Sequence, residues 1–139
     1  MAVDIRLLGD KEIVRKLKRL ADAVQNRVVK LASKKAIKPM LARVKSLTPV
    51  DTGRLRDSLK AVANKPSRGF VGYRVQPGNR KELGIDPQDK AFYPVVVEFG
   101  TDKVPAKSYL RAGFKSTEST SRKILLEEIG KGIERALKK

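Results

Sequence analysis

Residues 48–59, with the sequence TPVDTGRLRDSL, decide how the chain divides into structural elements. Pro49 ends the helical pattern that precedes it, because proline lacks a backbone N–H and disfavours helical geometry in the residue before it. Asp51 or Thr52 is expected to cap a second, short helix, because short polar side chains accept hydrogen bonds from the free N–H groups of a first turn. Two leucines four residues apart on this helix are expected to pack into the core: Leu55 and Leu59.

Upstream of this stretch the sequence predicts a short strand at residues 3–8 and then a long helical region. Apolar residues recur at helical spacing over residues 11–24 and 27–47, with a break expected near Gln25-Asn26. Pro39 lies inside the second pattern. Because the pattern resumes after it, we expect a kink at this proline rather than the end of the helix.

Downstream, residues 60–76 predict two strands around a turn-rich cluster, and residues 76–90 predict a long polar loop. The sequence YPVVVEF at residues 93–99 predicts a strand, which begins at a sheet edge because Pro94 cannot donate a ladder hydrogen bond. Residues 108–138 predict a C-terminal helix with an apolar stripe.

The predicted fold class is therefore α+β, with a small, mainly antiparallel sheet flanked by a long N-terminal helix and a C-terminal helix. A length of 139 residues is typical of one domain, which we expect to span residues 1–139. The hydrophobic content of 40% is sufficient for a globular core.

The residue inventory excludes several classes of enzyme. The chain contains no Cys and no His, so it offers no disulfide, thiolate, imidazole base or histidine metal ligand. It also has no glycine-rich phosphate loop, and we expect no cofactor. No stretch is long and apolar enough for a membrane span, and the first residues are too polar for a secretory signal. We therefore expect a soluble chain that is made inside the cell and has no membrane partner.

The charge balance points to a polyanionic partner. The formal net charge is +17, from 32 basic and 15 acidic residues. Five basic residues share the helix face opposite the apolar one, with no acidic residue between the first and the last: Arg27, Lys30, Lys34, Lys38 and Lys45. They are candidates for sequence-nonspecific contact with a phosphate backbone. The other interpretation is a solvated face, or one that meets acidic residues of a partner subunit.

Four acidic residues could be interpreted as a metal-dependent nuclease site: Asp51, Asp57, Glu98 and Asp102. A common nuclease pattern places a lysine two residues after a strand acid, but Glu98 is followed by Phe99 and Gly100. We therefore expect no metal and no catalytic residue. The competing interpretation of Glu98 is an ion pair with a basic neighbour.

A second stretch, at residues 93–101 and 105–110, follows residues 48–59 in an order and spacing that resemble a known family. The ordered pair resembles the tail-completion, or neck, proteins that join head to tail in siphophage-type tailed bacteriophages. The resemblance is carried by these positions: Pro49, Asp51, Thr52, Gly53, Leu55, Leu59, Tyr93, Val97, Glu98, Gly100, Thr101, Pro105, Ala106 and Leu110.

The resemblance implies a non-enzymatic virion protein at the head–tail junction, which is present in the host cytoplasm during assembly. It implies a homo-oligomeric ring, with a hexamer matching tail symmetry, next to the tail-terminator and connector proteins. Genomic DNA in the channel would meet the basic residues without a fixed register. The alternative to this role is a free, sequence-nonspecific nucleic-acid-binding protein.

Overall fold

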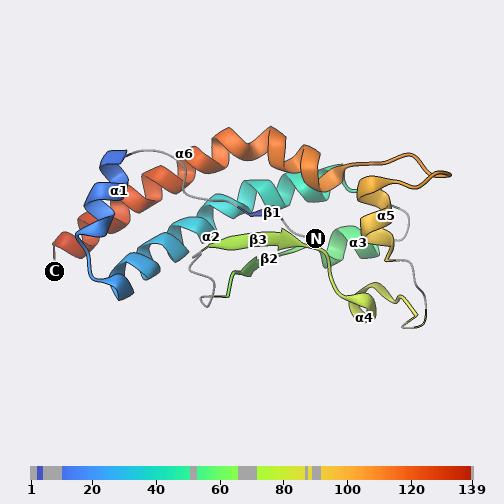
Figure 1. The fold of residues 1–139 in the computed structure, drawn as a ribbon, viewed down its shortest axis with the longest axis horizontal. Helices are drawn as coiled ribbons and strands as arrows, with labels where there is room; N and C mark the ends of the chain where they lie inside the picture. Colours follow the sequence, from blue (N-terminus) through green and yellow to red (C-terminus); the bar gives the residue numbers. More distant parts are fainter. Residues whose placement is uncertain are drawn as a thin grey trace.

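The structure, a computed structural model, describes residues 3–4, 11–50, 53–65, 72–86, 88 and 92–138. The elements in chain order are β1 (Val3–Asp4), α1 (Lys11–Lys18), α2 (Asp22–Leu47), α3 (Arg54–Ser58), β2 (Lys60–Ala63), β3 (Tyr73–Gln76), α4 (Arg80–Leu83), α5 (Tyr93–Phe99) and α6 (Tyr109–Leu137). The predicted α+β class is confirmed, with helix dominating (Figure 1).

The long helices α2 and α6 lie side by side and antiparallel (Figure 1). The end of α2 meets the start of α6 where Val44 faces Gly113, and the start of α2 meets the end of α6 where Val28 faces Gly132. Buried residues recur every four positions on both helices, a spacing that forms the ridges of the commonest class of helix packing. They are Val28, Ala32, Ala36, Met40 and Val44 on α2, and Tyr109, Gly113, Thr117, Ser121, Leu125, Ile129 and Ile133 on α6.

The strands form a small antiparallel sheet in the order β1-β3-β2. Val75 lies between Val3 of β1 and Ala61 of β2, so β3 is the central strand. Strands β2 and β3 pack against α2 (Figure 1). The two predicted strands around a turn are thus confirmed. Of the strand expected at residues 3–8, only Val3–Asp4 lies inside the described residues.

The apolar core consists of two clusters along the α2–α6 pair. The first cluster combines the C-terminal half of α2 with α3, β3, α4 and the start of α6, and it includes Met40, Leu55, Val75 and Tyr109. The second combines α1 with the N-terminal half of α2 and the C-terminal half of α6: Leu17, Val28, Ala32, Ala36, Leu125, Ile129 and Ile133. The core is therefore built around two helices that contact each other along their lengths.

The prediction of a strand at residues 93–99 is wrong, because this segment is the helix α5. The run of β-branched residues favoured a strand, but the burial pattern is helical, with Pro94 and Glu98 buried four residues apart. Proline at the start of a helix costs nothing, since the N–H that it lacks would have no helical partner there. Contacts with α6 therefore override the intrinsic strand preference of the valines.

Two details of the elements also differ from the sequence prediction, whereas the continuation of the long helix past Pro39 agrees with it. The break in the N-terminal helical region falls between Lys18 and Asp22, and Gln25 lies inside α2 and donates its side-chain amide to the carbonyl of Leu20. The predicted loop at residues 76–90 contains a helical turn, α4, which is capped by the Asn79 side chain. Helix α2 continues through Pro39, which excludes a helix end at that position.

The residues that begin the short helix α3 lie partly outside the described ranges. Asp51 and Thr52, the predicted caps, are among the residues that the structure does not describe. The described residue at the N-cap is Gly53, whose φ of +83° is left-handed and which has no side chain that could cap the helix. Leu55 and Leu59 are both buried, as predicted from their spacing.

Candidate functional site

The two stretches that carry the family resemblance come together in space. Leu55 and Leu59, from the α3 region, are buried in the same cluster as Leu110 at the start of α6. Tyr93 and Val97 of α5 are partly buried and pack against this cluster. Residues from both stretches therefore lie at one end of the molecule. Their packing in one cluster accounts for their order and spacing in the sequence.

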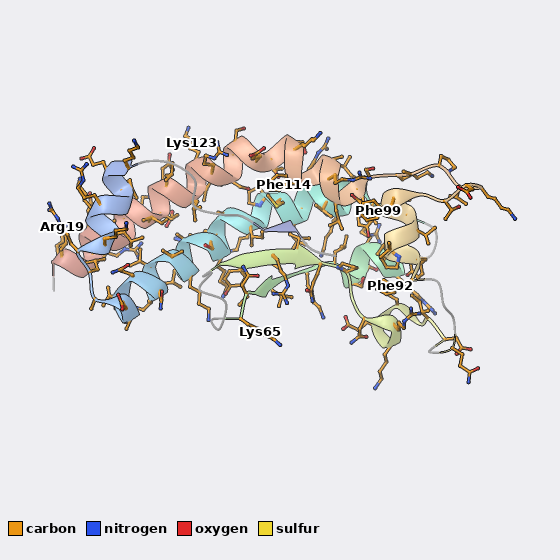
Figure 2. The ribbon with its side chains drawn as sticks, viewed as in Figure 1. Arg19, Lys65, Phe92, Phe99, Phe114 and Lys123 are labelled. Carbon is orange, nitrogen blue, oxygen red and sulfur yellow. The ribbon has the colours of Figure 1, made fainter. Side chains whose placement is uncertain are left out.

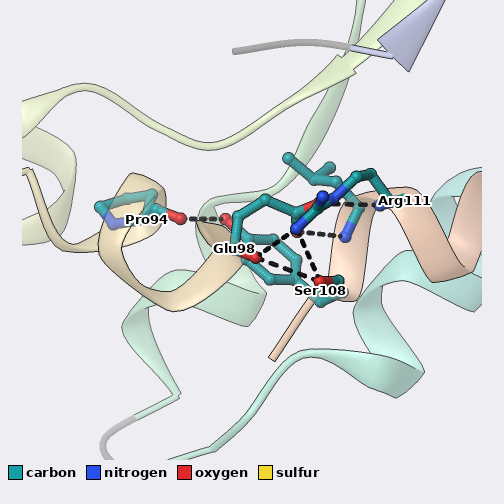
Figure 3. Close-up of polar contacts among 6 residues, drawn as sticks. Pro94, Glu98, Ser108 and Arg111 are labelled. Atoms are coloured by element: carbon teal, nitrogen blue, oxygen red, sulfur yellow. Dashed lines mark hydrogen bonds and ion pairs between the residues drawn. The ribbon is translucent and has the colours of Figure 1, made fainter. Parts of the chain in front are cut away.

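Glu98 is the polar centre of this end, and its side chain is 1% exposed. Its carboxylate accepts hydrogen bonds from the backbone N–H groups of Leu110 (2.9 Å) and Arg111 (3.0 Å) and from Arg111 Nε (2.9 Å) (Figure 3). Those N–H groups belong to the first turn of α6, where no helical acceptor exists for them. A carboxylate from α5 thus caps α6 at the positive end of its helix dipole.

Further hydrogen bonds hold the ends of α5 and α6 together (Figure 3). Arg111 Nη2 donates to the Glu98 carbonyl (2.9 Å) and to Ser108 Oγ (2.8 Å). The Tyr109 hydroxyl donates to the Pro94 carbonyl (3.0 Å). Burial raises the pKa of the Tyr109 phenol well above its usual range, and the nearby Glu98 carboxylate raises this pKa further. The tyrosine therefore stays a neutral donor at physiological pH.

The acidic residues considered for a nuclease site have other structural roles. The pairing of Glu98 with a basic neighbour is confirmed, although it occurs at a helix end rather than a strand end. Asp57 pairs with Arg56 at 3.0 Å, Asp102 is exposed, and Asp51 lies outside the described residues. Within the part of the chain that the structure describes, no group of three or more acidic residues is placed to hold a metal ion.

The segment after Glu98 turns sharply into an exposed loop, residues 101–107, that extends away from the helices (Figure 1). Gly100 has a φ of +74°, and a Cβ there would lie 2.7 Å from the backbone nitrogen of Ala106. Only glycine suits this position. The motif residues Thr101, Pro105 and Ala106 are exposed on this loop, where Thr101 accepts and donates backbone turn hydrogen bonds.

The five candidate DNA-facing residues all lie on α2. Arg27, Lys30, Lys34 and Lys38 are exposed, and Lys45 is half-buried. None of the five pairs with an acidic residue in the described ranges. Lys35, by contrast, pairs with Glu128 of α6 at 3.1 Å and lowers the pKa of that carboxyl by its hydrogen bond and charge. The five predicted residues thus form a strip of positive charge that no acidic residue in the described ranges neutralises through an ion pair.

Positive charge also occurs elsewhere on the surface. Figure 2 shows Arg19, Lys65 and Lys123 on different sides of the molecule, and all three are exposed. The α2 strip differs from these sites in its continuity, because the sequence between Arg27 and Lys45 contains no acidic residue. The described helices include none that is long and apolar enough to span a membrane.

The residues that sequence reasoning missed are Ser108 and Arg111. Arg111 donates to the buried carboxylate and to the backbone carbonyl of Glu98, and the Ser108 hydroxyl donates to the same carbonyl. Arg111 is thirteen residues away from Glu98 in the chain. An arginine at this distance carries no spacing signal of its own. The only indication was a lone glutamate in an apolar run, which must find a partner if it is buried.

Comparison with known proteins identifies the family. No curated protein and no solved structure matched the chain. The model of the HK97-gp10-like family, described as "Bacteriophage HK97-gp10, putative tail-component", matches residues 11–100, which is more than half of the sequence. The match includes the basic strip of α2, residues 48–59 and Glu98, and it ends before Pro105, Ala106 and Leu110. The chain therefore belongs to the HK97-gp10-like family of bacteriophage tail components.

Proposed function

We propose that this chain is a non-enzymatic structural protein at the head–tail junction of a phage. In this proposal it forms a homo-oligomeric ring, hexameric like the tail, between the tail-terminator and connector proteins. The basic strip of α2 lines the channel through which the genome passes. The observation that carries the proposal is this strip of five cations, which no described acid compensates, in a member of a tail-component family.

The geometry of the strip suits a channel wall. From Arg27 to Lys45 the helix rises by about 27 Å. Over this length one strand of duplex DNA carries several phosphates. Lysine and arginine side chains along a helix attract phosphates electrostatically without reading bases, so the DNA can slide past them. The firm packing of α2 against α6 would hold the strip in place while the DNA moves.

Mass measurement tests the ring. Native mass spectrometry of the purified protein, alone and with tails assembled in its absence, is expected to show a ring in solution or on the tail. A protein that stays monomeric and ignores tails would contradict the proposal. If that monomer still bound duplex DNA with steep salt dependence, the chain would be a free nucleic-acid-binding protein. The cations on several faces of the molecule are compatible with this alternative (Figure 2).

A pair of charge-matched variants tests the DNA contact. One variant replaces the five α2 residues with glutamine, and the control replaces five exposed cations elsewhere: Arg19, Lys65, Lys81, Lys115 and Lys123. Both lose the same net charge. The α2 variant is expected to lower the slope of log affinity against log salt by about four to five, because each phosphate contact contributes about 0.9. Equal losses in the two variants would show that the strip has no special role.

A further inference from the structure

Three exposed apolar side chains lie on α5 and on the loop that follows it, and we call them the α5 patch: Val95, Phe99 and Val104. Val95 and Phe99 are four residues apart on the outer face of α5, with 38% and 56% of their surface exposed. Val104, in the loop that follows, is 48% exposed. Clustered exposed apolar residues of this size are typical of a binding surface, whereas single ones are ordinary.

The loop that carries Val104 is exposed and yet internally ordered. The Thr101 N–H donates to the Val104 carbonyl (2.8 Å), and the N–H groups of Lys103 (3.2 Å) and Val104 (3.0 Å) donate to Thr101 Oγ1. The Lys107 N–H donates to the Val97 carbonyl of α5 (2.8 Å), so both ends of the loop are attached. Such a loop loses little conformational entropy on binding, which favours its use as a contact surface.

Cationic side chains border the α5 patch. The Arg111 guanidinium lies 4.7 Å from the centre of the Phe99 ring, and its bonds to Glu98 fix its position. Lys103 and Lys107 are exposed on the loop, where Asp102 is the single acidic residue. Figure 2 shows Phe99 at this end of the molecule, near the junction of α5 and α6. An aromatic residue under an arginine, with a polar rim, has the composition of an interface centre.

We propose that the α5 patch docks into an apolar pocket, bordered by aspartate and glutamate side chains, on a different protein of the phage tail. Charge complementarity selects this partner. Lys103 and Lys107 at the rim favour an acidic surface at this patch over the basic surface of a second copy, whose contacts in the proposed ring would use other faces. DNA would match the charge but would leave the apolar side chains without a suitable contact. The inference goes beyond the proposed channel role and uses residues that the α2 strip does not include.

Substitution of the patch tests the docking. The variant Phe99→Ser/Val104→Ser is compared with Leu137→Ser/Val50→Ser, which removes exposed apolar side chains outside the patch. The probe is purified tails assembled in the absence of this protein. We expect the patch variant to bind tails at least about tenfold more weakly, and the control to bind normally. Unchanged thermal unfolding of both variants shows that each is folded, as their exposure predicts.

Other outcomes of the same comparison overturn the proposal. Tail binding that stays within about twofold for the patch variant would show that the surface has no docking role. Loss of the homo-oligomer would make the partner a second copy, and loss of DNA affinity would make it nucleic acid. A failure of the α2 charge variant alone would leave this docking result intact, so the two proposals fail separately.

Zero-length crosslinking tests the chemistry of the partner directly. A carbodiimide joins a lysine amine to a carboxylate in contact with it. On complete tails, we expect mass spectrometry to find Lys103 or Lys107 joined to an aspartate or glutamate of another protein, and the Lys103→Arg/Lys107→Arg variant to lose these products. Products that join the two lysines only to carboxylates of this same chain, or no products at all, would overturn the acidic pocket.

Discussion

The two ends of the α2–α6 pair are held together by different interactions. At the end with α3 and α5, the buried carboxylate of Glu98 accepts directional hydrogen bonds from backbone N–H groups at the start of α6. At the end with α1, the cluster contains only aliphatic side chains, such as Leu17, Leu125 and Ile129. Hydrogen-bond networks require one geometry, whereas aliphatic packing tolerates similar shapes. The end that carries the exposed loop is therefore the one whose geometry is more strictly determined.

The largest effect is expected from Glu98→Ala. It leaves buried N–H groups of Leu110 and Arg111 without an acceptor, and we expect a loss of about 3 kcal/mol in the free energy of unfolding. The matched change at the other end is Glu128→Ala, whose pairs with Lys35 and Lys131 are near the surface, and it should have little effect. Chemical denaturation measures both. Similar losses would remove the contrast between the two ends.

A smaller effect is expected from Gly113→Ala. A Cβ at this position would lie 2.4 Å from Val44 Cγ2 and 3.1 Å from Val44 Cα, so the backbones of α2 and α6 must separate. We expect a loss of about 1–3 kcal/mol. Gly132→Ala at the other end meets only the side chain of Val28, which can move, and should cost less. Thermal unfolding compares the pair, and an equal or larger cost at Gly132 would contradict this reasoning.

The opposite sign is expected for Gly130→Ala. The nearest atom to its added Cβ is Ile13 Cδ1 at 3.9 Å, an ordinary contact distance. Alanine favours a helix over glycine by up to about 1 kcal/mol, so this variant should raise the midpoint of thermal unfolding. A lower midpoint would show that the aliphatic end is packed more tightly than the structure indicates.

The smallest effect is a pH dependence at the same end. The Lys35 hydrogen bond lowers the pKa of Glu128 below the usual value for a glutamate. A carboxyl with a lowered folded-state pKa contributes stability above the unfolded pKa, and this contribution disappears as the pH falls through the folded pKa. A carboxyl NMR titration should give a midpoint below 4.5 that rises in the Lys35→Met variant. An unchanged midpoint would show that the pair does not form in solution.

The sequence predicts those parts of the fold that have a periodic signal. The apolar spacing in α2 and α6 and the turn-rich cluster between β2 and β3 gave correct elements. Helix α5 was missed because its valines favour a strand locally, and only tertiary contacts with α6 make it helical. The strand preference of this short segment is outweighed because the helix places the Glu98 carboxylate against the first turn of α6.

The candidate site was predictable to different degrees in its different parts. The α2 strip follows from helical spacing alone, and in the structure four of its five residues are exposed while Lys45 is half-buried. The roles of Arg111 and Ser108 could not be predicted, since they depend on a loop that brings residues 98 and 111 together. The α5 patch could not be predicted either. The predicted strand would have made Val95 and Phe99 part of a sheet, whereas the helix leaves both side chains exposed.

The two glycine contacts between α2 and α6 fix how far one helix can slide along the other. A shift by one turn would place Val44 against Tyr109 or Thr117 in place of Gly113, and Val28 would leave Gly132 in the same movement. Because both contacts must break together, the pair behaves as one rigid rod. In the proposed ring, the helix pair would therefore hold the basic strip of α2 and the exposed loop at residues 101–107 at a constant distance from each other.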